Sequence, residues 1–328
     1  MSKLKVVVTD YVFENFNSEE KILGEIGAEL RVFQCKNPQE LKEKVKDADA
    51  ILNTYLSPLD REIFKHAPDL KIIVRYGIGV DTINIKDATE FGIMVANVPD
   101  YCVEEVADHA MTLFLALARK IVISDKNVKK GNWSLSYLKP LKGISEMTAG
   151  IVGFGRIGKA IAGRLTPFGL KILFFDPYLK ESTITGNKKV DFDTLVETAD
   201  VIFIQCPATD STYHLFNREV FSKMKKSPLV INTARGKILD TDSLIWALEN
   251  GLISGAALDV IEDESRVQEK DFPLKSSDNV ILTPHSAWYS ENSIRKLQQK
   301  AAEEVVRGLT GKRPRSLINP EVLERRNA

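Results

Sequence analysis

The chain has 328 residues, enough for about two domains. Its 44% apolar and 27% charged residues are typical of a globular protein, and its 45 basic side chains balance its 45 acidic ones, so we expect neither nucleic acid nor an anionic membrane as a partner. No uninterrupted apolar run reaches the roughly 18 residues of a membrane-spanning helix. The three scattered cysteines predict neither a disulfide framework nor a zinc site, which favours a reducing, cytoplasmic location.

The first hundred residues alternate between short β-branched runs and segments of helical period. Helices are expected at residues 21–30, around Leu41, near Ile63 and near Asp87. This βαβα order predicts a parallel sheet covered on both faces, in a small doubly wound, flavodoxin-like α/β domain. Its expected strands are KVVVTD, RVFQC, DAILN, KIIVRYG and GIMVANV.

A second βα series follows a long amphipathic helix, expected from Val103 to about Ile123, and the connecting loop GNWSLSYLKPLKG. Six strands in one series indicate a doubly wound Rossmann domain, which binds dinucleotides. The helical segment at 290–309 has no strand of its own, so we expect it to pack on the first domain. The predicted domains are residues 1–99 with 289–328, and residues 100–288. The six strands are AGIVG, KILFFD, DVIFIQC, PLVINTA, SGAALDV and NVILTP.

The segment GFGRIG follows the apolar strand AGIV and precedes a helix. Gly153 suits a tight turn, Gly155 lets the backbone approach a pyrophosphate, and Gly158 allows close packing of helix on strand. Glycine-rich turns are common, but the position of this one between a strand and a helix favours a dinucleotide site.

Asp176 ends the next strand, KILFFD, 18 residues after Gly158. A carboxylate in that position can accept hydrogen bonds from both hydroxyls of the adenosine ribose, and it repels a 2′-phosphate. We therefore predict NAD rather than NADP as the cofactor. The alternatives are that Asp176 and Pro177 form only a turn, or that the nearby cation of Lys180 accommodates NADP.

Open α/β sheets bind their ligands beyond the carboxyl ends of the strands, so the residues that follow each strand are candidates for function. Arg235 stands out because its planar guanidinium can bind a carboxylate through two hydrogen bonds, and Gly236 permits a sharp turn. A solvated surface arginine is the alternative. The other residues at such positions are Cys206, Pro207, Thr233, Ala234, Asp259, Pro284 and His285.

His285 is one of four histidines. A carboxylate near it would favour the imidazolium form and fix the tautomer, and the cluster Glu262, Asp263 and Glu264 offers three candidates. Spacing alone does not choose among them, and such clusters are usually solvated loops. The other histidines are interpreted as structural or exposed: His66, His109 and His214.

Taken together in this order, the glycine loop, NTARG, GAALDV and TPH resemble the D-2-hydroxyacid dehydrogenase family over nearly the full length of the chain. VRYGIGVDTINI looks like the Arg-x-Gly-x-Gly-x-Asp-Asn loop of that family, and VPDYCVEEVADHA is similar to the start of its interdomain helix. The resemblance implies a substrate domain, residues 1–99 with 289–328, and an NAD-binding domain, residues 100–288. It also implies a homodimer with AMTLFLALARK at the interface.

Carried over by position, the resemblance makes Arg235 the clamp of the substrate carboxylate and carbonyl, His285 the proton donor or acceptor, and Glu264 its carboxylate partner. The family pattern Asp-Val-x-x-x-Glu-Pro maps onto LDVIEDES, in which Ser265 replaces the proline. The implied substrate-binding residues are Tyr76, Gly77, Ile78, Gly79, Arg235, His285 and Trp288. The predicted cofactor-binding residues are Gly153, Gly155, Arg156, Ile157, Gly158, Asp176, Cys206, Pro207, Thr233, Ala234, Arg235, Asp259, His285 and Ala287.

The implied reaction is reversible hydride transfer between NADH and C2 of a 2-oxo acid, with the first domain closing over the substrate. A glutamate beside the histidine argues against formate, and the stretch TYLSP offers no cation for a phosphate. The tail TPHSAWYSENS looks most like the C-terminal-binding-protein branch, in which Trp288 would line the pocket and favour an apolar or thioether side chain. The alternatives are a phosphoglycerate dehydrogenase and a non-enzymatic, corepressor-like scaffold that senses NAD.

Overall fold

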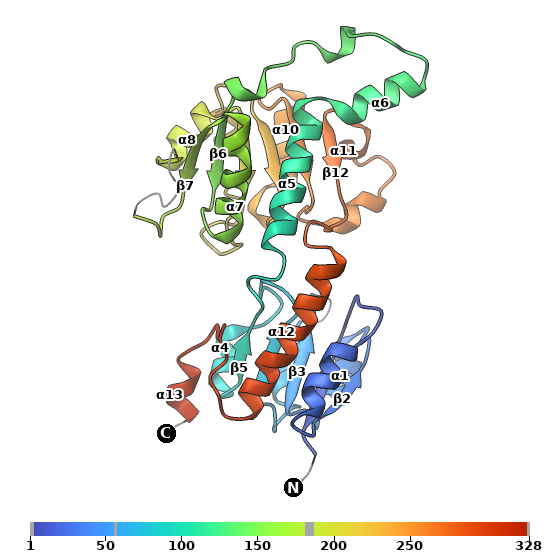
Figure 1. Ribbon diagram of the computed structural model, residues 1–328, viewed down its shortest axis with the longest axis vertical. Helices are drawn as coiled ribbons and strands as arrows, with labels where there is room; N and C mark the ends of the chain where they lie inside the picture. Colours follow the sequence, from blue (N-terminus) through green and yellow to red (C-terminus); the bar gives the residue numbers. More distant parts are fainter. Residues whose placement is uncertain (1–2, 56–57, 181–186, 327–328) are drawn as a thin grey trace. The chain divides into compact units, whose positions relative to one another are not determined.

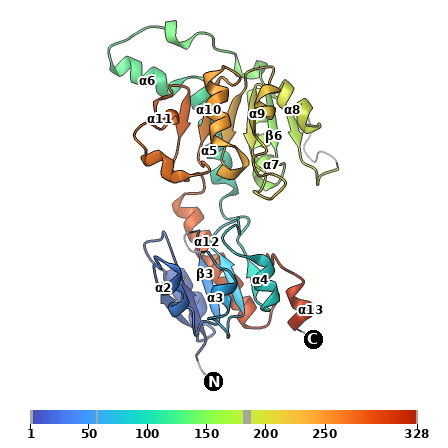
Figure 2. The same ribbon diagram turned by 180° about the vertical axis from the view of Figure 1, so that it is seen from behind.

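The computed structural model describes residues 3–55, 58–180 and 187–326. The chain forms two compact units, Met1–Cys102 with Ser290–Ala328, and Val103–Tyr289. The sequence predicted these boundaries between residues 99 and 100 and between residues 288 and 289. Each unit contains one parallel sheet with helices on both faces (Figures 1 and 2), which confirms the predicted α/β class with two doubly wound domains.

The first unit is built on a five-stranded sheet of order β2-β1-β3-β4-β5, the order of flavodoxin-like folds. The two central strands β3 and β4 are buried along their whole length, as expected for parallel strands covered on both faces. All five predicted strands are present. They are β1 (Lys5–Val8), β2 (Glu29–Val32), β3 (Ala50–Asn53), β4 (Ile72–Arg75) and β5 (Met94–Ala96).

In this unit α1 and α12 cover one face of the sheet, and α2, α3 and α4 cover the other (Figures 1 and 2). The expected helix at 21–30 is wrong in its bounds. It ends at Gly24, and Gly27 takes a φ of 69° at the turn that leads into β2, so Leu30 belongs to the strand. The helices are α1 (Asn17–Gly24), α2 (Pro38–Lys44), α3 (Arg61–Phe64), α4 (Ile85–Glu90), α12 (Glu291–Leu309) and α13 (Val322–Arg326).

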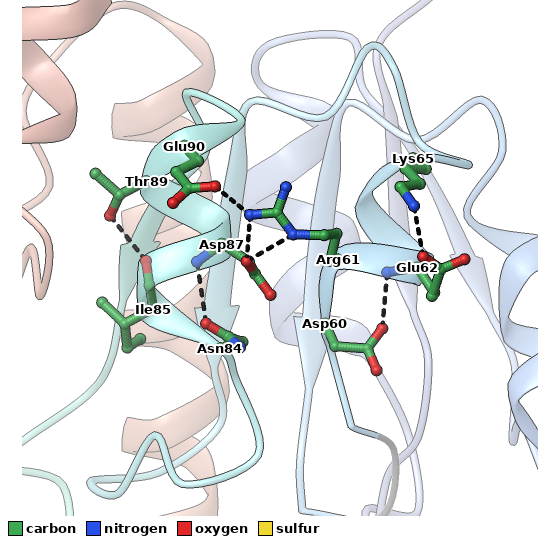
Figure 3. Close-up of polar contacts among 9 residues, drawn as sticks. All are labelled: Asp60, Arg61, Glu62, Lys65, Asn84, Ile85, Asp87, Thr89 and Glu90. Atoms are coloured by element: carbon green, nitrogen blue, oxygen red, sulfur yellow. Dashed lines mark hydrogen bonds and ion pairs between the residues drawn. The ribbon is translucent and has the colours of Figure 1, made fainter.

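The short helices α3 and α4 are joined by ion pairs (Figure 3). Arg61 donates to Asp87 Oδ1 at 3.0 Å from Nε and at 2.6 Å from Nη2, and it also pairs with Glu90. The side chains of Asp60 and Asn84 cap the two helices at their N-termini. Because the Arg61 side chain is 44% exposed, solvent screens these ion pairs and they add little to stability.

Helix α12 packs on the first unit, as the sequence predicted. It begins with a capping box formed by Ser290 and Ser293, and it crosses β4 at Gly308. A Cβ atom at Gly308 would lie 2.5 Å from Cδ1 and 3.1 Å from Cβ of Ile72, so a larger residue there would require Ile72 to move. The last strand of the second unit is thus followed directly by a core helix of the first.

The second unit contains a seven-stranded parallel sheet of order β12-β11-β10-β9-β6-β7-β8, the Rossmann order extended by one strand. The six predicted strands are present. The sequence missed β8, because its three residues NKK are polar and pair only with β7 at the edge of the sheet. The strands are β6 (Thr148–Val152), β7 (Lys171–Phe175), β8 (Asn187–Lys189), β9 (Val201–Ile204), β10 (Leu229–Asn232), β11 (Gly255–Leu258) and β12 (Val280–Leu282).

Helices α5 and α7 pack on one face of this sheet, and α8, α9 and α10 pack on the other (Figures 1 and 2). The expected long helix is wrong beyond Ala118, because Lys120 takes a left-handed φ of 51° and a separate helix begins at Ile121. None of the described helices combines the length and apolar character needed to cross a membrane. The helices are α5 (Val103–Ala118), α6 (Ile121–Lys129), α7 (Arg156–Leu165), α8 (Phe192–Thr198), α9 (Arg218–Ser222), α10 (Thr241–Glu249) and α11 (Pro273–Ser276), with 3-10 turns η4 (Gly236–Ile238) and η5 (Glu264–Gln268).

Candidate active site

The candidate site lies where the parallel strands of the second unit end. Because all these strands run in one direction, the loops after β6, β7, β9, β10, β11 and β12 emerge at the same edge of the sheet. The chain reverses its direction of progress between the neighbouring strands β6 and β9, which is where open α/β sheets bind ligands. The glycine loop follows β6 and therefore lies at this switch point.

Each of the three glycines meets a distinct steric requirement. Gly153 has a φ of 92°, and a Cβ atom there would lie 2.5 Å from the backbone nitrogen of Cys206. At Gly158 the carbonyl oxygen of Gly153 already fills the place of a Cβ. Gly155 faces open space, and α7, which begins with Arg156 and Ile157, has no side-chain cap. An uncapped helix start below open space fits the pyrophosphate of a dinucleotide.

Asp176 follows β7 and is tied to the glycine loop. Its Oδ2 accepts a hydrogen bond from the Phe154 N–H at 2.9 Å, and its Oδ1 accepts one from the Tyr178 N–H at 3.0 Å. The carboxylate is therefore fixed as a negative group beside the predicted pyrophosphate site. This arrangement fits the expected contact with a ribose diol, and it disfavours a 2′-phosphate.

The loops after β9 and β10 are joined by side-chain hydrogen bonds. Gln205 Nε2 donates to Thr233 Oγ1 at 2.7 Å. Burial of Cys206 raises the pKa of its thiol to about 11, so this cysteine is a neutral thiol at physiological pH. Pro207 beside it is exposed, and Thr233 is buried. The cysteine thus contributes packing to the loop rather than a nucleophile.

Arg235 leaves the end of β10 in a turn held by Asn232. The Asn232 side chain donates to the Arg235 carbonyl at 3.1 Å and accepts from the Ala234 N–H at 3.0 Å. The half-buried guanidinium donates to the Ala234 carbonyl through Nη1 at 2.7 Å. At Gly236 the backbone of Ile261 occupies the space that a Cβ would need, so the sharp turn predicted there requires glycine.

Asp259 holds the turn that carries His285. Its buried carboxylate accepts hydrogen bonds from Thr283 Oγ1 at 2.6 Å, from the Ser286 N–H at 2.9 Å and from the Ala287 N–H at 2.9 Å. The sequence predicted a cofactor contact for Asp259. These bonds hold the turn, and the cofactor contact of Asp259 stays a prediction.

His285 takes a left-handed φ of 52° at the end of β12, a conformation that few non-glycine residues adopt. Its Nδ1 lies 3.3 Å from Glu264 Oε1. The hydrogen bond and the charge of His285 lower the pKa of Glu264, so the carboxylate remains ionised at neutral pH. The structure thus brings together the pair that the resemblance implied.

The two neighbouring acids have other partners. Glu262 accepts hydrogen bonds from His214, and Asp263 accepts from the Ser265 N–H at 3.0 Å, which begins η5. The alternatives left open by spacing are therefore resolved in favour of Glu264 as the neighbour of His285. His66 is exposed, and its Nδ1 lies 2.8 Å from the carbonyl oxygen of Glu62.

The sequence did not predict the contacts of His109, which was interpreted as structural. Its Nε2 lies 3.0 Å from Thr283 Oγ1 and 3.6 Å from Asp259 Oδ1. His109 lies on α5, whereas Thr283 follows β12. No spacing in the sequence connects these two residues. Trp288 follows the turn half-buried, with its ring 5.8 Å from that of Tyr289.

In the first unit, the loop at residues 76–79 is partly committed to internal contacts. The N–H groups of Tyr76 and Gly77 donate to the Asn53 and Arg75 carbonyls, each at 2.8 Å. The Tyr76 hydroxyl is buried and donates to Glu19 Oε1 at 2.7 Å, and burial raises the pKa of both side chains. Of the four N–H groups expected to bind a substrate carboxylate, two are thus already engaged. Ile78 and Gly79 are the remaining members of this loop.

A family model described as the NAD binding domain of D-isomer specific 2-hydroxyacid dehydrogenases matches residues 111–287. The chain belongs to this family. A D-isomer specific 2-hydroxyacid dehydrogenase is an NAD-dependent oxidoreductase, and the match covers the glycine loop, Arg235, Glu264 and His285 within one unit.

Similar proteins extend the assignment over both units. The chain is 40% identical over 292 residues to a glyoxylate reductase of Thermofilum pendens, a match that covers 87% of this chain and 86% of that protein. It is 37% identical over 319 residues to D-3-phosphoglycerate dehydrogenase of Methanocaldococcus jannaschii, covering 96% of this chain and 59% of that protein. Among solved structures, D-lactate dehydrogenase of Aquifex aeolicus complexed with NAD and lactic acid has a TM-score of 0.87 at 30% identity, covering 96% of this chain and 99% of that one.

Replacement of Gly158 by alanine should weaken NAD binding. The new Cβ would displace the Gly153 carbonyl and with it the turn of the glycine loop, so we expect the Kd for NADH to rise ~5- to 150-fold, since overpacking costs about 1–3 kcal/mol. Titration of NADH fluorescence measures this. The matched control is Gly163→Ala, which lies in the same helix beside open space and should leave the Kd unchanged. Equal Kd values for the two variants would contradict the steric assignment.

Proposed function

We propose that the protein reduces a small 2-oxo acid with NADH, with His285 and Glu264 as the acid/base pair and Arg235 as the carboxylate clamp. The observation that carries this proposal is the 3.3 Å approach of Glu264 Oε1 to His285 Nδ1. The loops that bear Arg235, Glu264 and His285 follow β10, β11 and β12, which are neighbours in the sheet. A carboxylate clamp and a proton donor thus come from adjacent strand ends.

The contact with Glu264 gives the two ring nitrogens of His285 different functions. Nδ1–H donates to the carboxylate, which fixes the orientation of the ring and leaves Nε2–H to give its proton to the substrate oxygen. The planar guanidinium of Arg235 binds the substrate carboxylate through two hydrogen bonds and polarises the carbonyl. When bound, NADH supplies the hydride that the carbonyl carbon receives. For the first unit, we propose that the N–H groups of Ile78 and Gly79 contribute the backbone contact with the carboxylate.

The cofactor residues predicted from the sequence are retained in this proposal, Asp259 included. Gly155 and the start of α7 would bind the pyrophosphate, and Asp176 would bind the adenosine ribose. Among the described residues of this edge, the exposed Lys180 favours NADP. We therefore expect the kcat/KM for NADH to exceed that for NADPH.

Glu264→Gln should move the pH profile of reduction. Removal of the negative charge beside Nδ1 makes the protonated imidazole less favourable, so activity should be lost at lower pH than in the wild type. Because the Glu264 side chain is 58% exposed, solvent screens its charge, and we expect the alkaline limb of kcat/KM to move only a little toward lower pH. Steady-state kinetics between pH 5 and 10 measure it.

His285→Ala is the companion variant, since it removes the proton donor itself. We expect kcat to fall by about 10²–10⁴-fold with the Kd for NADH nearly unchanged. A normal pH profile for Glu264→Gln would remove Glu264 from the proposal, and near-normal turnover of His285→Ala would remove the whole acid/base assignment.

The substrate proposal combines the relatives with Trp288. The relative from Thermofilum pendens is named a glyoxylate reductase, and the half-buried indole of Trp288, three residues after His285, offers an apolar wall. We propose glyoxylate and short apolar or thioether 2-oxo acids as substrates. The likeness to the C-terminal-binding-protein branch stays a prediction, because it rests only on the segment TPHSAWYSENS, which contains Trp288.

A panel of 2-oxo acids discriminates the proposal from its alternatives. We expect glyoxylate, 4-methyl-2-oxopentanoate or 4-methylthio-2-oxobutanoate to give a kcat/KM at least ~10-fold above that of 3-phosphohydroxypyruvate, because a phosphate without a cation loses about 1.5–3 kcal/mol of charged hydrogen bonding. Consumption of NADH at 340 nm is the measurement.

The similarity to D-3-phosphoglycerate dehydrogenase supports the first alternative, and preference for 3-phosphohydroxypyruvate would establish it. Of the stretch TYLSP, which was predicted to lack a cation for phosphate, Leu56 and Ser57 lie outside the described residues. The scaffold alternative predicts tight NADH binding without turnover of any 2-oxo acid.

We also propose a homodimer, but with another interface than the one expected. The large side chains of AMTLFLALARK, including Met111, Phe114 and Leu117, are buried within the second unit and are not available to a partner. Exposed apolar side chains instead lie on α6 and the chain after it, which extend away from the rest of their unit at the top of Figure 1. They are Ile121 (56% exposed), Val122 (52%), Trp133 (88%) and Leu135 (70%).

Light scattering at micromolar concentration should give the mass of two chains, because a second copy covers this apolar segment. The double variant Trp133→Glu/Leu135→Glu should shift the mass to that of one chain. Tyr178→Glu is the control, since this ring is also 88% exposed but lies outside the segment. A monomeric wild type, or a double variant that stays dimeric, would contradict the proposed interface.

A further inference from the structure

His214 joins the loop after β9 to the loop after β11. Its Nε2–H donates to both carboxylate oxygens of Glu262 at 2.9 Å, and Tyr213 donates to Glu262 Oε1 at 3.2 Å. The rings of Tyr213 and His214 are stacked with their centroids 4.0 Å apart. The His214 backbone has a left-handed φ of 48°, and its N–H donates to the Lys237 carbonyl in the loop after β10. One residue thus contacts both neighbouring loops.

The loops after β10 and β11 also touch each other directly. The backbone of Ile261 and Glu262 fills the space beside Gly236, so these two segments are in contact without an intervening side chain. Arg235 precedes Gly236, and Glu264 lies two residues after Glu262. The proposed carboxylate clamp and the proposed partner of His285 therefore depend on the same set of contacts.

Glu264 itself has little to hold it in place. Its side chain is 58% exposed and reaches His285 at 3.3 Å. The two residues before it are fixed by their side chains, Glu262 by His214, and Asp263 by Ser265. Holding the Glu264 side chain beside His285 costs the conformational entropy of both its backbone and its rotamers. The hydrogen bonds of the two preceding residues already fix the backbone, so only the rotamer cost remains.

We infer that His214, acting through Glu262, is a positioning residue that holds Glu264 within reach of His285. This inference rests on the proposed function of the His285 and Glu264 pair. His214 takes no part in proton transfer to the substrate. It sets the geometry of the carboxylate that contacts His285 Nδ1.

The same imidazole belongs to a group of three potential metal ligands, His214, Asp240 and Glu262, whose ligand atoms lie within 4.8 Å of one another. The Asp240 carboxylate is already used as the N-cap of α10, accepting from the Asp242 N–H at 3.3 Å and from the Ser243 hydroxyl. Glu262 is shared by His214 and Tyr213. Internal hydrogen bonds therefore explain the group, and we assign it to the structure of the loops.

The test is the pH profile of 2-oxo acid reduction in variants of this contact. His214→Phe keeps a ring for stacking but removes the donor, and we expect its alkaline limb to move to that of Glu264→Gln and its kcat to fall about 10-fold, since misplacement by about 1 Å costs up to 10²-fold. Glu262→Gln should have an effect in the same direction. His214→Gln, which keeps an N–H donor, should restore most of the wild-type profile.

A double-mutant cycle adds a second readout. If the two residues act as one unit, His214→Phe/Glu262→Gln should be no worse in kcat than the worse single variant. His66→Phe is the matched control, because His66 is exposed and lies in the first unit. Thermal melting and the Kd for NADH identify variants that fail to fold. If His214→Phe is one of them, the pH profile of His214→Gln is compared with that of the wild type instead.

The outcomes separate this inference from the proposed function. If Glu264→Gln shifts the profile while His214→Phe and Glu262→Gln do not, the positioning by His214 is refuted and the proposed function stands. If Glu264→Gln leaves the profile unchanged, the acid/base pair falls and this inference falls with it. Dialysis against EDTA should leave the wild-type profile unchanged, and activity lost to EDTA but restored by Zn²⁺ would assign His214 to a metal instead.

Discussion

The buried carboxylate of Asp259 is the constraint on which the end of the second unit depends. It accepts three hydrogen bonds from the turn after β12, one from a hydroxyl and two from backbone N–H groups. Hydrogen bonds to a charged group contribute about 1.5–3 kcal/mol each. They offset the cost of about 1–3 kcal/mol for the left-handed backbone at His285. A strained residue at the end of a strand is thereby held in one conformation, and its imidazole is presented beyond the sheet.

Two glutamates show how environment sets the charge of one residue type. Glu264 is exposed and lies beside an imidazole, which lowers its pKa and keeps it ionised. Glu19 is buried between Tyr76 and Gln298, and desolvation raises its pKa. The carboxylate of Glu264 thus contacts the imidazole of His285, whereas that of Glu19 joins α1 to α12. Position within the fold, more than residue type, decides which acid can take part in chemistry.

The parts of the fold that were predictable are those in which burial imposes a pattern. Parallel strands such as β3, β4, β9 and β10 are buried on both faces, so each reads as an unbroken apolar run, and the glycine loop has a steric requirement at every glycine. The edge strand β8 has no apolar residue to reveal it. The left-handed Lys120 that ends α5 also lacks a proline or glycine signal.

The site was predictable as far as the strand ends determine it. Arg235 and His285 follow their strands directly, so the parallel topology alone brings them to one edge. Glu264 could be chosen only by resemblance, because it stands in an acidic cluster in a loop whose path depends on contacts with His214 and Gly236. The contact of His109 with Thr283 joins elements far apart in sequence, and only the packed structure reveals it.

The return of α12 to the first unit has a consequence for synthesis of the chain. The second unit is one continuous segment, Val103–Tyr289, whereas the sheet of the first unit is covered by a helix that begins at Glu291. As the ribosome extends the chain from its N-terminus, the five strands of the first sheet exist long before their helix does. The later segment can therefore complete its fold first, and the earlier one keeps part of one apolar face uncovered until α12 emerges.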